Sequence, residues 1–374
     1  MSDGIEKLGM PKWGLSMTEG RVVDWLVEEG AELSVGDDVA EVETEKINGV
    51  VESPAAGILR RRVAVAGDVV PVGGLLGVIA DASVPDEEID RFVEEFQATF
   101  VPEAEEEAGP EPETVTVEAG KLRFVRLGED GEPVVLIHGF GGDLDTWLFN
   151  SEALASDRTV YALDLPGHGG STKDVGAGDL GVLVGALRAF LDSQGLERGH
   201  LVGHSLGGLV AAALALEQPE RALSITLVDS AGLGPEIDRE YIEGFVAAES
   251  RRDLKPVLQR LFVDEKLVNR QMVNDVLKYK RLDGVQEALR TMADSLFSEG
   301  RQQHLVGDEL ASLSVPLMVV WGEEDRIIPV EHANAVPESA QVERLPGKGH
   351  SPHMEAAGRF NELLQGFLAG VRVA

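Results

Sequence analysis

The chain has 374 residues, a formal net charge of −33 at pH 7 and no cysteine. This length suits about two or three domains, and the lack of cysteine excludes disulfides, thiolate nucleophiles and thiolate metal sites. The acidic charge disfavours binding to nucleic acid and to anionic membrane surfaces. The sequence shows neither an export signal nor a run of about 18 consecutive apolar residues, so we expect a cytoplasmic protein without a membrane segment.

Residues 1–82 contain an internal repeat. Gly30 and Gly67 stand at equivalent places in two similar apolar patterns, at a spacing of 37 residues. Each half alternates apolar and polar residues between turn residues, which predicts a small, flattened, all-β barrel-sandwich with pseudo-twofold symmetry. Between the halves, the polar segment 43–49 predicts a hairpin that exposes Lys46 at its tip.

The segment that ends at Lys46 reads Glu-Thr-Glu-Lys and resembles the lipoyl domains of 2-oxo acid and acetoin dehydrogenase complexes. Further matches to these domains are spread over the first domain, at Met10-Pro11-Lys12, Glu19-Gly20, Trp25, Glu29-Gly30, Val35-Gly36-Asp37 and Ser53 to Gly57. The resemblance implies that Lys46 carries lipoate through an amide bond. Biotin carriers share the fold but place methionine on both sides of the lysine, whereas Glu45 and Ile47 flank Lys46.

Residues 83–113 predict an amphipathic helix followed by a linker. Apolar side chains recur at helical spacing at Ile89, Phe92, Val93, Phe96 and Phe100. This stripe needs a cover, either from this chain or from a partner subunit, and we expect packing on this chain. Residues 101–113 are too charged and proline-rich to bury a core, so they predict a linker that makes the first domain mobile. Nothing resembles the small subunit-binding domain of other lipoyl-bearing acyltransferases, which leaves the docking of other subunits open.

Residues 114–374 predict an α/β domain. After an antiparallel start at 114–127, apolar runs alternate with helix-length segments and predict buried parallel strands at 134–137, 160–163, 201–202, 225–228, 317–321 and 342–345. Residues 232 to about 311 interrupt this alternation with successive helical segments, which predicts a helical cap above the carboxyl ends of the strands. Ligands of such sheets bind at those ends.

The segment 203–208, Gly-His-Ser-Leu-Gly-Gly, predicts a nucleophile elbow. It follows the predicted strand 201–202 and precedes a helix rich in Leu and Ala that stops at Pro219. A serine on so sharp a turn crowds the residues two positions away, which accounts for the glycines before and after Ser205. Ser205 is therefore a candidate nucleophile.

Two later residues fit partners for this serine. Asp325 and His350 each follow a predicted strand, in the chain order serine, aspartate, histidine. Together with the motifs at 138–142 (His-Gly-Phe-Gly-Gly) and 164–169 (Asp-Leu-Pro-Gly-His-Gly), this order resembles the α/β-hydrolase family over about 260 residues. The resemblance implies an α/β-hydrolase fold for 114–374.

The same resemblance implies a role for each site residue. Ser205 would be the nucleophile, His350 the base that takes its proton, and Asp325 the acid that orients the imidazole. The oxyanion hole would consist of the backbone N–H groups of Phe140 and Leu206.

Nearby polar residues have plainer interpretations. His204 is predicted to pack at the elbow and His168 to order its loop. His353 is predicted to lie beside the base, and it stays open as an alternative to His350. Asp229 ends a predicted strand at a position that supplies the acid in some members of the family, so it stays open as an alternative to Asp325. No group of residues has a spacing typical of metal ligands, and we expect no metal site.

A lipoyl arm and an acyl-transfer site on one chain resemble the dihydrolipoyllysine-residue acetyltransferase components of acetoin dehydrogenase complexes. The resemblance implies transfer of an acetyl group from the arm to coenzyme A. It also implies two partners, a thiamine diphosphate-dependent acetoin-cleaving component and dihydrolipoamide dehydrogenase, and we expect a homo-oligomer. The segment from His304 to Asp308 lacks the glycine of the His-x-x-x-Asp-Gly motif that standard 2-oxo acid acyltransferases carry.

Two alternatives remain open. The chain could be a thioesterase or carboxylesterase that carries a lipoyl domain, or a lipoyl scaffold with acyl transfer elsewhere. A coenzyme A site needs cations, and the candidates are Arg251-Arg252 with Lys255 and Lys278 with Lys280-Arg281. Ordinary solvated helix faces are the simpler explanation of these basic residues.

Overall fold

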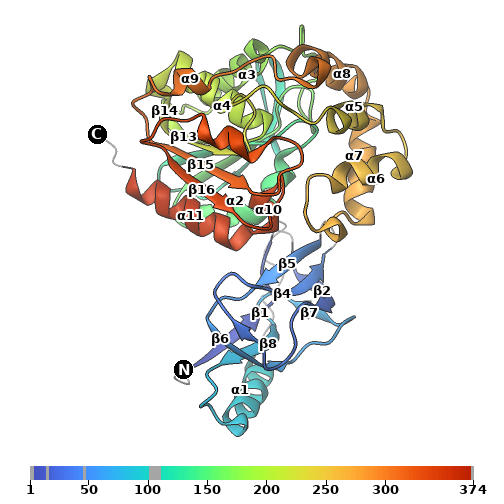
Figure 1. The fold of residues 1–374 in the computed structure, drawn as a ribbon, viewed down its shortest axis with the longest axis vertical. Helices are drawn as coiled ribbons and strands as arrows, with labels where there is room; N and C mark the ends of the chain where they lie inside the picture. Colours follow the sequence, from blue (N-terminus) through green and yellow to red (C-terminus); the bar gives the residue numbers. More distant parts are fainter. Residues whose placement is uncertain (1–3, 14–16, 45–47, 101–110, 372–374) are drawn as a thin grey trace. The chain divides into compact units, whose positions relative to one another are not determined.

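The computed structural model describes residues 4–13, 17–44, 48–100 and 111–371. The chain forms two compact units, Met1–Gly109 and Pro110–Ala374, and each is considered by itself. Figure 1 shows the strands of the first unit in blue and the larger α/β unit in green to red. None of the helices in the described ranges is both long and apolar enough to cross a lipid bilayer.

The first unit contains two four-stranded antiparallel sheets that reproduce the internal repeat. One sheet has the order β1 (Ile5–Gly9), β8 (Leu75–Ala80), β6 (Gly57–Arg62) and β3 (Glu32–Leu33). The other has the order β5 (Asn48–Glu52), β4 (Asp38–Glu43), β2 (Glu19–Trp25) and β7 (Val69–Pro71). Strands 37 residues apart, such as β4 and β8, occupy the same place in opposite sheets. The predicted pseudo-twofold arrangement is therefore confirmed.

The β4–β5 hairpin is the predicted carrier hairpin. Glu43 at the end of β4 pairs with Asn48 at the start of β5, which closes the connection 44–47. Lys46 falls in this connection but lies outside the described residues. Gly49 packs so closely on Trp13 that an added Cβ would come within 2.7 Å of its ring. The strands that lead to the lysine are thus held by the core of the unit.

Helix α1 (Asp86–Thr99) packs on the first unit itself. Ile89 is fully buried among residues of β8, and Phe92 and Phe96 pack against the same cluster. Two ion pairs hold the edge of the helix to β6, Arg60 to Asp86 at 2.7 Å and Arg61 to Asp90 at 2.9 Å. The expectation that this chain covers its own apolar stripe is confirmed.

The second unit is built on an eight-stranded sheet. Its order is β16 (Gln341–Leu345), β15 (Leu317–Gly322), β14 (Ala222–Val228), β13 (Gly199–His204), β11 (Pro133–Ile137), β12 (Thr159–Leu163), β10 (Gly120–Leu127) and β9 (Glu113–Val117). β9, β10 and β12 pair antiparallel, and the sheet from β12 to β16 is parallel. All six predicted parallel strands are present, each within a few residues of its expected range.

Helices lie on both sides of this sheet (Figure 1). α3 (Leu180–Ser193) packs beside α4 (Leu206–Glu217), and α2 (Leu148–Leu154) packs beside α11 (Ala357–Gly370) and the short α10 (Pro352–Glu355). Every residue of α4 from Leu206 to Ala215 is buried, as expected for a helix that is apolar on all sides. The predicted nucleophile elbow therefore starts a helix that is fixed in the core.

The insertion between β14 and β15 is helical, as predicted. It contains α5 (Arg239–Ala247), α6 (Arg251–Gln259), α7 (Arg270–Lys280), α8 (Val285–Leu296) and α9 (Gly307–Leu310). Tyr241 and Phe245 of α5 reach the loop after β11, where Phe245 packs on Phe140 with ring centroids 6.0 Å apart. The cap thus touches the loop that follows the first parallel strand.

Candidate active site

Ser205 stands on a strained turn between β13 and α4. Its φ of 51° and ψ of −117° lie in a region that residues with a Cβ rarely occupy. The two neighbouring glycines are required by space, because a Cβ at Gly203 would lie 2.2 Å from the carbonyl oxygen of Gly207, and one at Gly207 would lie 2.2 Å from that of Ile137. The local sequence thus forms the sharp elbow that presents a serine side chain.

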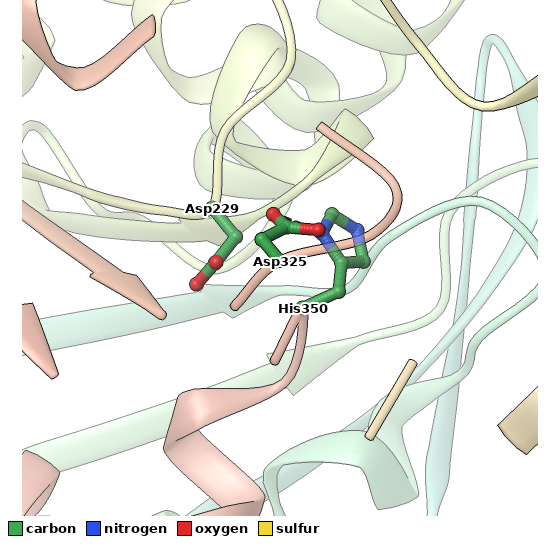
Figure 2. Close-up of side chains that lie close together, drawn as sticks. All are labelled: Asp229, Asp325 and His350. Atoms are coloured by element: carbon green, nitrogen blue, oxygen red, sulfur yellow. Dashed lines mark hydrogen bonds and ion pairs between the residues drawn. The ribbon is translucent and has the colours of Figure 1, made fainter. Parts of the chain in front are cut away.

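Asp325 and His350 are hydrogen-bonded to each other. The imidazole Nδ1 lies 2.8 Å from Asp325 Oδ2, and both side chains are almost fully buried (Figure 2). The other carboxylate oxygen, Oδ1, accepts hydrogen bonds from the N–H groups of Ile327 at 2.7 Å and Ile328 at 3.0 Å. The loops after β15 and β16 therefore bring together two of the three predicted residues and fix the imidazole by its Nδ1.

His204 connects this pair to the serine. Its Nε2 donates a hydrogen bond to the backbone oxygen of His350 at 2.7 Å, and the two rings lie 4.9 Å apart. Because His204 directly precedes Ser205, this bond ties the loop of His350 to the elbow. Burial lowers the pKa of His204 well below its usual value, which keeps the ring neutral.

The loop after β11 orients the predicted N–H of Phe140. His138 Nδ1 donates to the carbonyl oxygen of Gly139 at 2.8 Å. In a trans peptide the carbonyl and the following N–H point in opposite directions, so this bond sets the direction of the Phe140 N–H. Gly139 lies against the nucleophile, since a Cβ there would come within 2.9 Å of Ser205 Cβ. The second predicted donor, Leu206, is the first residue of α4, where N–H groups have no partner within the helix.

The next peptide of this loop is held at both ends. Gly141 donates its N–H to His168 Nε2 at 3.1 Å, and the carbonyl oxygen of Phe140 accepts the Tyr241 hydroxyl at 3.3 Å. Burial lowers the pKa of His168 well below its usual value, which keeps Nε2 free to accept. His168 thus orders its loop, as expected. Sequence reasoning missed Tyr241, because no spacing links the cap to residue 140.

His353 has the features of a packing residue. Its ring packs at a tilt against Trp147 and His204, with centroid distances of 4.5 Å and 4.6 Å. Neither of its nitrogens has a hydrogen-bond partner among the described residues. Burial, with a smaller effect from His350, lowers the pKa of His353 to about 3. The carboxylate partner therefore favours His350 over His353 as the base.

Glu355 is a second residue that sequence reasoning missed. One of its carboxylate oxygens accepts the N–H of Gly349, directly before His350, and the other accepts the N–H of Val263 in the cap at 2.7 Å. Burial raises the pKa of Glu355. The side chain links the loop of His350 to the cap. The only feature of the sequence that could have pointed to Glu355 is its position, five residues after the predicted base.

Asp229 lies beside the pair at the end of β14. One ligand atom each from Asp229, Asp325 and His350 lie within 4.8 Å of one another, and such a group could hold a metal ion. Three separate strand ends supply these residues, so no sequence spacing could reveal the cluster. Because His350 Nδ1 is already bonded to Asp325, we interpret it as an acid–base pair with an additional carboxyl group.

A second serine–histidine–carboxylate chain lies at the other end of the strands. His200 is 2.8 Å from Ser224 Oγ through Nδ1 and 3.0 Å from Glu132 through Nε2. Ser224 belongs to β14, which is paired on both sides, and its side chain is buried. Since no turn presents Ser224 to a substrate, we interpret the hydrogen bonds among these three residues as a structural network.

Two candidate cations for coenzyme A, Lys280 and Arg251, have hydrogen-bond partners within the chain. Lys280 is buried and donates to the backbone oxygens of Phe245 and Val246. Arg251 bonds Asn274 at 2.5 Å but is exposed, as are the other candidates, Arg252, Lys255, Lys278 and Arg281.

Comparison with known proteins gives matches over both units. The family model described as alpha/beta hydrolase fold matches residues 132–357, and the model described as biotin-requiring enzyme matches residues 6–79. The predicted fold, a small all-β lipoyl-type domain joined to an α/β-hydrolase domain, is confirmed. A meta-cleavage product hydrolase from Pseudomonas fluorescens has a similar fold, with a TM-score of 0.64 at 23% identity over 70% of this chain and 98% of that chain.

Two curated relatives match along almost their whole length. The dihydrolipoyllysine-residue acetyltransferase component of the acetoin cleaving system of Cupriavidus necator is 49% identical over 99% of both chains. The component with the same description from Pseudomonas putida is 49% identical over 97% of this chain and 98% of the relative. Both units are therefore similar to those of the relatives, in the same order.

Proposed function

The chain belongs to the family of dihydrolipoyllysine-residue acetyltransferase components of acetoin cleaving systems, and we propose that Ser205 carries the acetyl group between a dihydrolipoyl arm on Lys46 and coenzyme A. One observation carries the proposal. A strained serine elbow and a buried Asp325–His350 pair occur on the same chain as a lipoyl-type unit.

The carrier hairpin fits an attached arm. The pairing of Glu43 with Asn48 leaves Lys46 in the connection between two core strands. A lipoyl group bound there supplies the acetyl group as a thioester. Helix α1 packs on the carrier unit, so we place it with residues 1–100. We assign residues 101–112 as the linker to the hydrolase unit, which begins with β9 at Glu113.

The first half of the reaction acylates the serine. His350 takes the proton of Ser205 Oγ, which attacks the thioester carbonyl, and Asp325 stabilises the resulting imidazolium. The negative charge that develops on the carbonyl oxygen is bound by the N–H groups of Phe140 and Leu206. The carbon–sulfur bond then breaks, and His350 returns its proton to the leaving sulfur.

The second half regenerates the enzyme. His350 takes the proton of the coenzyme A thiol, whose sulfur attacks the acetyl-serine carbonyl. The serine oxygen leaves and recovers its proton from the same imidazole. The cap and Phe140 must exclude water from this step, because water would release acetate instead. The exposed Arg252, Lys255, Lys278 and Arg281 are candidates for the phosphates of coenzyme A.

We also propose the setting in which this reaction takes place. A thiamine diphosphate-dependent acetoin-cleaving component would load the arm, and dihydrolipoamide dehydrogenase would reoxidise it. The protein would act in the cytoplasm as a homo-oligomer, and the reaction as written uses no metal.

One assay separates this function from its two rivals. Wild type and Ser205→Ala are given acetyl-dihydrolipoamide with and without coenzyme A, and acetyl-coenzyme A and acetate are both measured. We expect acetyl-coenzyme A that disappears with the serine, while the control Ser193→Ala retains it. Acetate as the main product would indicate a thioesterase, and product formation that does not depend on Ser205 would indicate a scaffold.

The arm is tested separately by intact mass. Wild type from a host supplied with lipoate should carry one lipoyl adduct that Lys46→Arg loses and Lys12→Arg keeps. An unmodified wild type would contradict the carrier assignment.

A further inference from the structure

Two buried carboxyl groups meet behind the candidate base. Asp229 is fully buried, and Figure 2 shows it next to Asp325, whose carboxyl group points at His350. The two carboxyl groups and the imidazole approach within 4.8 Å of one another. Two negative charges so close together in a dry interior repel strongly, so the pair is expected to hold a proton.

The hydrogen-bond donors around the pair decide which carboxyl is charged. Asp325 accepts three N–H groups, from Ile327, Ile328 and His350. Asp229 accepts one, from the backbone of Gly322 at 3.0 Å. Its Oδ2 is buried, and no described residue offers it an N–H or O–H donor. N–H donors favour the charged form of a carboxyl group. The charge therefore belongs to Asp325, and Asp229 Oδ2 is the atom with room for the proton.

The backbone at Asp229 supports a functional role. Its φ is 43°, so it shares the left-handed region with Ser205 among very few described residues other than glycine. Such strain persists where the surroundings impose it and is concentrated at functional sites. Burial, followed by the charge of Asp325 and a smaller effect from Glu355, raises the pKa of Asp229 well above its usual value.

We propose that Asp229 is a positioning residue that holds one proton for the buried pair, so that the single negative charge rests on Asp325 and faces His350. This rests on the proposed role of His350 as base. The protonated carboxyl of Asp229 donates a hydrogen bond to Asp325 and opposes rotation of its carboxylate away from the imidazole. The titratable groups that face Asp229 are Asp325, His350 and Glu355.

The proposal has a consequence for the loss of Asp325. In Asp325→Asn the charge of Asp325 no longer raises the pKa of Asp229. Burial still raises that pKa, but Asp229 releases its proton more readily than in wild type. It then becomes the nearest carboxylate to His350. Part of the activity should survive through Asp229, whereas a purely structural Asp229 would give no such rescue.

The first test detects the proton directly in the full-length protein. Infrared difference spectra at neutral pH compare wild type with Asp229→Asn, and with the exposed Asp294→Asn as control. We expect wild type to show the C=O band of a protonated carboxyl that Asp229→Asn loses and Asp294→Asn keeps. A band that Asp229→Asn retains, or no such band in wild type, would overturn the proposal.

The second test measures the rescue. Acetylation of Ser205 by p-nitrophenyl acetate needs neither coenzyme A nor the lipoyl arm, so it separates this inference from the acetyltransferase function. Asp325→Asn should acetylate Ser205 about tenfold or more faster than the double variant Asp229→Asn/Asp325→Asn. Equal rates of Ser205 acetylation in the two variants would contradict the proposal. Asp229→Ser replaces Asp229→Asn in both tests if the asparagine variant fails to fold.

Discussion

At the scale of single residues, the site depends on peptide groups that side chains hold in place. His138 fixes the carbonyl of Gly139, and His168 fixes the N–H of Gly141. Both rings are buried, and burial lowers the pKa of each. Neutral imidazoles are needed here because each ring must donate at Nδ1 and accept at Nε2. The loop after β11, which we propose as the oxyanion loop, is therefore organised before a substrate arrives.

The Tyr241 hydroxyl should matter for rate. Tyr241→Phe removes its hydrogen bond to the Phe140 carbonyl oxygen, and we expect the rate of Ser205 acylation to fall by about three- to tenfold, as for the loss of one hydrogen bond. Tyr279→Phe is the matched control, because its hydroxyl bonds the carbonyl of Gly167 outside the oxyanion loop. Single-turnover acylation measures both. Equal effects of the two substitutions would argue against a special role for Tyr241.

The sequence pointed to the candidate residues for the chemistry more readily than to the residues that hold them in place. Ser205, Asp325 and His350 were recognisable because each sits in a motif or after a predicted strand. Tyr241, Glu355 and the contact between Asp229 and Asp325 depend on which loops meet in space. Local spacing contains no information of that kind, so these residues were found only in the structure.

At the scale of elements, the repeat in the first unit was readable because its glycines and apolar positions recur along the chain. The repeat predicted two similar halves but not the order of the strands. The structure shows that strands related by the repeat lie at the same position in the two different sheets. Helix α1 was readable as an amphipathic stripe. The surface that α1 covers could not be read from the sequence, because an apolar stripe can pack on a partner subunit as well as on its own chain.

The helix should stabilise the carrier unit. Ile89 is fully buried against β8, so Ile89→Ala should cost about 3 kcal/mol of local stability. Glu94→Ala, on the exposed face, should cost little. Hydrogen exchange of the β8 amides in the full-length protein reports the difference. Similar exchange rates in the two variants would show that α1 does not support the sheet.

At the scale of the whole molecule, buried histidines make the hydrolase unit sensitive to acid. His353 has a pKa lowered by burial from 6.5 to about 3, so the unfolded chain binds its proton first as the pH falls. Stability is therefore complete above the unfolded pKa and is lost as the pH falls towards the folded value. As the pH falls from 6.5 to about 5, protonation of this residue in the unfolded chain should lower the free energy of unfolding by about 2 kcal/mol.

Urea unfolding at these two pH values tests the acid sensitivity. His353→Phe fills the space beside Trp147 without a titrating group, so it should reduce the loss of stability on acidification by about 2 kcal/mol. Wild type and variant with the same dependence on pH would show that His353 already holds a proton in the folded protein.

The central claim, that Ser205 carries the acetyl group, is tested most directly by trapping it. Full-length protein is mixed with acetyl-dihydrolipoamide, quenched with acid, digested and analysed by mass spectrometry. We predict an acetyl group on the peptide that contains Ser205, absent from Ser205→Ala and discharged as acetyl-coenzyme A when coenzyme A is added before the quench. Acetyl-coenzyme A formed at the wild-type rate by Ser205→Ala, with no acetylated peptide in wild type, would contradict the account.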